Sequence, residues 1–123
     1  MNRKSLAFGA LLAITAVRAD GLEPVRIAVS PLRSFAPSNL VVRVMVEPST
    51  DNRVLEVIAD GPNFYRSSDV QLDGKEGPSV VQLQFHNVPG GDYEVAATVR
   101  NGAGHPVASA HRDVTVFDPR QEQ

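Results

Sequence analysis

The sequence predicts an all-β fold, a Greek-key sandwich of about seven antiparallel strands. Three observations support this prediction. After the first nineteen residues the chain consists of short apolar runs that are rich in valine and alternate with polar residues. Pro, Gly, Asn or Asp interrupt these runs at intervals of about ten residues, which is typical of sandwiches and barrels. No long stretch has the 3.6-residue period of an amphipathic helix.

Residues 1–19 are predicted to be a secretory signal peptide. A basic start with Arg3 and Lys4 precedes an apolar run of thirteen residues, and Val17 and Ala19 occupy the small-residue cleavage positions. The apolar run is short for a membrane span, although an uncleaved N-terminal anchor is the alternative. Cleavage would give an exported protein, periplasmic or secreted, that has no membrane span.

The charge of the mature chain argues against a nucleic-acid partner. The sequence has 12 basic and 14 acidic residues, and the signal peptide contains three of the basic ones, so cleavage leaves 9 against 14. A domain with net negative charge repels phosphate backbones. The sequence has no cysteine, so the exported domain has no disulfide and depends on its core for stability.

Alternation and turn residues give the first strands in order. Residues 25–30 form a strand, and the segment 31–37 is assigned to a sheet edge because its prolines cannot donate to a ladder. Further extended runs cover 39–48, 53–60 and 64–74, and another covers 79–88. The positions expected to face the core are Leu40, Val42, Val44, Val46, Leu55, Val57, Ala59, Val81, Leu83 and Phe85.

A lone tyrosine begins the next alternating run. Tyr93 follows a turn that contains Gly90 and Gly91, and Val95, Ala97 and Val99 continue in phase with it, so it is expected to point inward. A buried tyrosine needs a partner for its hydroxyl, and the turn just upstream offers free backbone groups. This arrangement resembles the tyrosine corner of Greek-key sandwiches.

On these residues, the chain resembles bacterial immunoglobulin-like and fibronectin type III-like domains. The resemblance covers nearly all of the mature chain and is specific in "PGGDYEV" and "VTV". Val95 stands where antibody-type domains have their second cysteine, and the sequence has no tryptophan, so the resemblance implies a disulfide-free sandwich. A transthyretin-like or carboxypeptidase-regulatory-like sandwich shares the Pro-Gly-x-Tyr turn and is the alternative fold.

The last strand leaves its inward face undecided. It covers 105–117 after a tight hairpin, and either the set Ser109, His111 and Asp113 or the set Ala108, Ala110 and Arg112 faces outward. The second set is in phase with inward valines, so a charged Arg112 there suggests a bulge. The sandwich domain is expected to span 20–117, with a polar tail over 118–123.

The protein is expected not to be an enzyme, because the sequence lacks catalytic motifs. The preferred function is a non-catalytic binding or structural module of the bacterial cell envelope that acts through protein contacts. The alternative is a small-ligand or carbohydrate-binding module, with Phe64, Tyr65 and Arg66 as the candidate ligand loop. No cofactor or metal is expected, because the three histidines of the sequence are read as unclustered surface residues.

The candidate partner surface is the outward face of the sheet that contains residues 53–60 and 93–100. Its small and β-branched side chains are easily covered by a protein partner or by a second copy of the chain. The residues assigned to this face are Val54, Ile58, Ala96 and Thr98.

Overall fold

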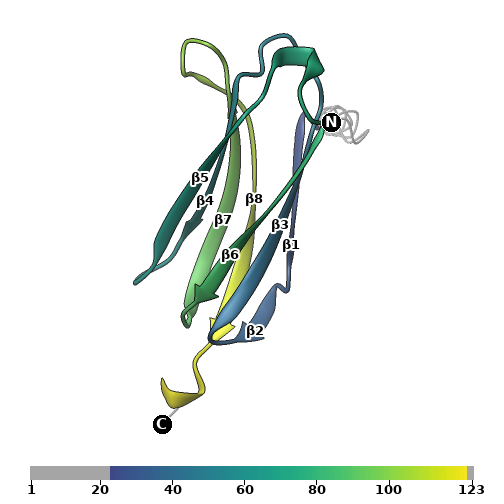
Figure 1. The fold of residues 1–123 in the computed structure, drawn as a ribbon. Coiled ribbons are helices and arrows are strands. Elements are labelled where there is room, and N and C mark those ends of the chain that lie inside the picture. Colours follow the sequence, from purple (N-terminus) through teal and green to yellow (C-terminus); the bar gives the residue numbers. More distant parts are fainter. Residues whose placement is uncertain (1–22, 122–123) are drawn as a thin grey trace, which may run out of the picture.

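Two β-sheets pack face to face along their length (Figure 1). The computed structural model describes residues 23–121, so the signal peptide predicted for residues 1–19 lies outside the described residues. The first sheet has the order β1–β3–β6 and consists of β1 Val25–Ser30, β3 Ser38–Val46 and β6 Val80–Val88. The second has the order β2–β8–β7–β4–β5 and consists of β2 Arg33–Phe35, β8 Pro106–Phe117, β7 Gly91–Arg100, β4 Val54–Asp60 and β5 Tyr65–Gln71.

The all-β fold with antiparallel sheets is confirmed. The described residues contain eight strands, because the proline-interrupted segment 31–37 forms a short strand of its own, β2. This strand lies at the edge of the second sheet and pairs with β8 in parallel over three residues. The other elements are single 3₁₀ turns, Gly74–Glu76 and Pro119–Gln121. Within residues 23–121 there is no helix with the length and apolar character needed to cross a membrane.

The core lies between the sheets and is built from the alternating positions of each strand. Strand β3 is typical, because Leu40, Val42 and Val44 are fully buried while Asn39 and Arg43 are exposed. Burying a valine or leucine side chain completely contributes about 1.5–3 kcal/mol. All the core positions named above are buried except Leu83, which is half-buried and packs against the core.

The structure resolves the phase of the last strand. The pairing of β7 with β8 runs without a break from Gly91 to Val99, so the expected bulge at Arg112 is wrong; the register shifts at Val99/Arg100 instead. Ser109, His111 and Asp113 face outward, whereas Ala108 and Ala110 pack against the core. Arg112 has the same inward phase but is exposed. Strand β2 pairs with β8 only from Thr115 onward, so β8 is a sheet edge at Arg112. The Arg112 guanidinium reaches round this edge and donates a hydrogen bond to the His111 carbonyl.

Tyr93 is 3% exposed, and its hydroxyl donates a hydrogen bond of 2.6 Å to the Pro89 carbonyl in the preceding turn. Burial raises the pKa of this hydroxyl above its ordinary value. The edge of the Tyr93 ring meets the Phe64 ring at a centroid distance of 5.8 Å. Gly91 has a φ of +157°, which side chains rarely adopt, and a Cβ on Gly90 would approach Asp118 to 2.6 Å. The turn therefore requires both glycines.

Candidate functional site

The loop expected to bind a ligand presents one open aromatic ring. Tyr65 is 60% exposed, but Phe64 is half-buried against Tyr93, and the Arg66 guanidinium lies 4.9 Å from the centre of the Phe64 ring. The Phe64 ring is therefore already in contact with the Tyr93 ring and with the Arg66 guanidinium. This loop therefore lacks the pair of exposed rings that would form a stacking platform.

The residues expected to form the partner surface do lie together on the outer face of the second sheet. Ile58 pairs with Ala96, Thr98 lies two residues further along β7 opposite Glu56, and Val54 lies four residues before Ile58 opposite Arg100. All four are half-buried, and an ion pair of 3.1 Å between Arg100 and Glu56 crosses the same face. The four side chains therefore share this face with a charged pair.

A row of carboxylates crosses this same face. Strand register places Asp60 of β4 beside Glu94 of β7, and Glu94 beside Asp113 of β8. The row ends at the exposed ring of Tyr65 on β5, which pairs with Asp60. Cross-strand neighbours on one face lie about 4.5–5.5 Å apart at their Cβ atoms, so these side chains can converge.

His111 joins two members of this row. It lies two residues before Asp113 on β8, and its Nε2 atom is 3.8 Å from a carboxylate oxygen of Glu94. The ligand atoms of Glu94, His111 and Asp113 all lie within 4.8 Å of one another, and all three side chains are exposed. Among residues 23–121 this is the one such group of three, and we call it the ligand cluster.

The donor set of the ligand cluster fits a divalent first-row metal ion. One imidazole and two carboxylates suit Mn²⁺, Fe²⁺ or Zn²⁺, and the set has one imidazole fewer than the two-histidine, one-carboxylate triad of non-haem iron sites. Donors bound at about 2.0–2.2 Å to one ion lie roughly 3–3.5 Å apart, so the side chains must close by about 1 Å. Exposed side chains can make such a movement by changing rotamer.

An open hollow of about 440 Å³ adjoins the ligand cluster. Four carboxylates line it, those of Asp60, Asp92, Glu94 and Asp113. Thr115 also lines it and donates a hydrogen bond of 3.1 Å from Oγ1 to the Asp92 carboxylate. The hollow is therefore strongly acidic. His111 lies beside it, two residues before Asp113 on β8.

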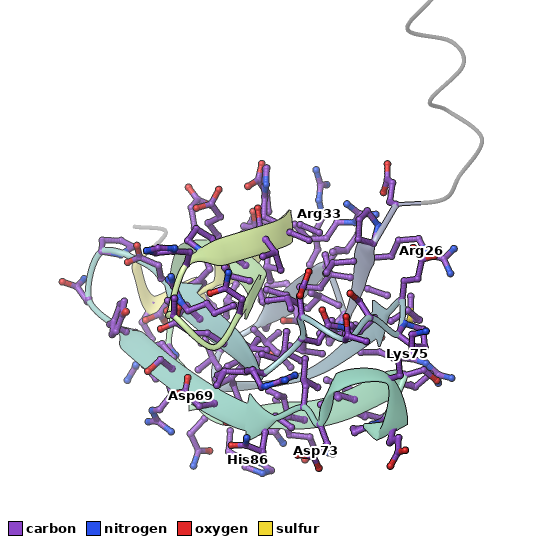
Figure 2. All side chains as sticks on the ribbon, turned by 90° about the horizontal axis from the view of Figure 1, so that it is seen from above. Arg26, Arg33, Asp69, Asp73, Lys75 and His86 are labelled. Carbon is purple, nitrogen blue, oxygen red and sulfur yellow. The ribbon has the colours of Figure 1, made fainter. Side chains whose placement is uncertain are left out.

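The other two histidines lie elsewhere. His86 is exposed on β6 of the first sheet, on the side of the molecule opposite Arg33 of β2 (Figure 2). His105 is exposed in the hairpin before β8, where its carbonyl accepts a bond from Asn101. The histidines were expected to be unclustered because only histidines were considered as ligands. His111 was therefore not combined with the neighbouring carboxylates. The useful signal was His-x-Asp on one strand together with Glu94 on the preceding one.

Comparisons with known proteins give structural neighbours only. No family model matches the chain, and no curated protein matches it. Superoxide reductase (neelaredoxin) from Ignicoccus hospitalis is similar with a TM-score of 0.55 at 16% identity, over 76% of this chain and 80% of that one. A variant of the same enzyme matches over 94% of this chain and 99% of that one, with a TM-score of 0.56 at 16% identity.

A family 76 glycoside hydrolase from a bovine Bacteroides thetaiotaomicron strain is also similar. Its TM-score is 0.55 at 15% identity, and the match covers 81% of this chain but only 22% of the hydrolase. The fold therefore occurs both as nearly the whole of one enzyme and as a small part of another.

These neighbours correct several expectations. The expected membership among immunoglobulin-like and fibronectin type III-like domains is wrong, because three of the matching structures are superoxide reductases, which have a different fold. The expectations of a non-catalytic envelope module and of a protein that is not an enzyme are contradicted for the same reason, since these neighbours are enzymes. At 15–16% identity the likeness itself concerns the fold.

Proposed function

We propose that the protein is a metal-dependent enzyme whose ligand cluster, Glu94, His111 and Asp113, holds one divalent first-row transition ion. The observation that carries the proposal is the convergence of one imidazole and two carboxylates from neighbouring strands. The superoxide reductases among the structural neighbours make superoxide reduction the reaction to test first.

The residues of the ligand cluster would bind the ion and leave it open to solvent. Glu94 and Asp113 together offset the charge of a divalent ion, and His111 adds a neutral nitrogen donor. Because all three side chains are exposed, solvent reaches the cluster and can supply protons. When bound, a ferrous ion would supply one electron to superoxide, which takes up two protons to form hydrogen peroxide, and an external one-electron donor would restore the ferrous state.

Metal binding is tested first, by calorimetry with Mn²⁺, Fe²⁺ and Zn²⁺ under anaerobic conditions. The parent should bind one ion per chain, and His111→Gln or Glu94→Gln should weaken binding at least about tenfold, as losing even a supporting residue does at metal sites. His86→Gln and His105→Gln are matched controls and should bind as the parent does. Equal binding by His111→Gln and His86→Gln would remove the site from consideration.

The reaction is tested separately, by stopped-flow decay of superoxide with the iron-loaded protein and excess reductant. The parent and the His86→Gln control should accelerate the decay and form hydrogen peroxide, and His111→Gln should not. A parent that binds one iron but leaves the decay unchanged would retain the metal site and exclude this reaction.

A further inference from the structure

We propose that Asp60 and Asp92 set the charge selectivity of the ligand cluster, so that neutral or cationic ligands are favoured over anions there. The inference rests on the proposed function, because it concerns molecules that approach a bound metal ion. It names two specificity-determining residues that are not themselves members of the ligand cluster.

Asp60 and Asp92 are placed at the site by strand register. Asp60 is the cross-strand neighbour of Glu94, and Asp92 lies two residues before Glu94 on the same face of β7. Strands are about 4.8 Å apart, and same-face residues on one strand about 6.8 Å apart, so the two carboxylates lie roughly 8–10 Å from an ion held between Glu94, His111 and Asp113. Both line the same hollow as Glu94 and Asp113.

The charge of the loaded site follows from this placement. Glu94 and Asp113 balance a divalent ion, which leaves the charges of Asp60 and Asp92 in the hollow. Neither of these carboxylates forms an ion pair within residues 23–121. An anion that approaches the ion therefore meets two uncompensated negative charges, while a neutral molecule meets none of this repulsion.

The size of the effect can be estimated from Coulomb's law. One unit charge at about 9 Å in water changes the affinity for a monovalent anion about twofold, so both carboxylates together change it roughly fivefold at low salt. At about 0.15 M salt the screening length is about 8 Å, and the effect becomes smaller. Superoxide is itself an anion, so the same two carboxylates limit its reaction with the site.

The test uses Co²⁺-loaded protein and two small probes, the anion azide and neutral imidazole at pH 8, followed by visible absorption. Asp60→Asn and Asp92→Asn should each tighten azide binding about twofold, and the double variant roughly fivefold, with imidazole affinity unchanged. Asparagine retains an oxygen that can accept the Thr115 hydrogen bond, so Asp92→Asn keeps its local contact. Circular dichroism checks that each variant is folded.

Asp69→Asn is the matched control. It removes the same charge from the same sheet face, but Asp69 lies on β5 beside Glu56, roughly 15 Å from the ligand cluster by strand spacing. It should change azide affinity by no more than about 1.6-fold, well below the effect of the double variant. Unchanged azide affinity in a double variant that binds Co²⁺ would overturn the charge-selectivity inference and leave the metal site standing. A parent that binds no Co²⁺ would overturn both proposals.

Discussion

A single methyl group at Gly61 should destabilise the domain strongly. A Cβ placed on Gly61 would overlap the Cδ1 and Cε1 atoms of the Tyr93 ring. The φ of Gly61 is outside the left-handed region, so alanine is allowed there by the backbone and the glycine is needed for space alone. In Gly61→Ala, either the ring or the chain around residue 61 must move.

Two contacts hold the Tyr93 ring in place. They are the hydrogen bond to the Pro89 carbonyl and the edge-on contact with Phe64. Losing a buried hydrogen bond costs about 1–1.5 kcal/mol, and losing an aromatic pair about 0.5–1.5 kcal/mol. We therefore expect Gly61→Ala to lower the free energy of unfolding by about 1.5–3 kcal/mol, which is within the range for overpacked cores.

Urea denaturation measures this loss, and a double-mutant cycle assigns its cause. In a Tyr93→Leu background the ring is gone, so Gly61→Ala should be neutral or should stabilise by up to about 1 kcal/mol through the unfolded state. A single variant within about 0.5 kcal/mol of the parent would refute this reasoning, and so would an equal loss in both backgrounds.

Further predictions concern the core, the tyrosine and the N-terminus. Tyr93→Phe leaves the Pro89 carbonyl without its donor and should cost about 1–2 kcal/mol in urea melts; an unchanged midpoint would show that the bond contributes nothing. Because burial raises the pKa of Tyr93, the unfolded chain loses this proton first, so the free energy of unfolding should fall as pH rises above about 10, and less steeply in Tyr93→Phe. Leu40→Ala should cost about 2–5 kcal/mol by calorimetry, whereas Leu32→Ala, at a position 48% exposed, should cost far less. The exported protein should begin at Asp20 by intact mass, and a species that retains residues 1–19 would contradict cleavage.

Most of the fold could be predicted from the sequence because a strand with one buried face has apolar side chains at alternate positions. Leu40, Val42 and Val44 are read directly in this way, and all are fully buried. The last strand was ambiguous because alanines carry little information about burial, and Arg112 occupies an inward phase that only its place at a sheet edge permits.

The ligand cluster was not predicted because it depends on the register between strands as well as on the sequence signal. Glu94 and His111 are 17 positions apart in the sequence, and only the pairing of β7 with β8 places Glu94 beside Asp113 and brings His111 within reach. Alternation shows which face a residue occupies but not which residue lies opposite it. The same limit applies to the acidic hollow, because alternation does not show that Asp60 lies opposite Glu94.

The short strand β2 makes the start and the end of the chain depend on each other during folding. The Thr115 amide donates to the Leu32 carbonyl, and the Ala36 amide donates to the Phe117 carbonyl. The second sheet therefore lacks its edge strand until the last part of the chain is available. Such distant pairings are slow to form, and a nascent chain that has not yet reached Phe117 must remain incomplete, with the apolar faces of its first strands uncovered.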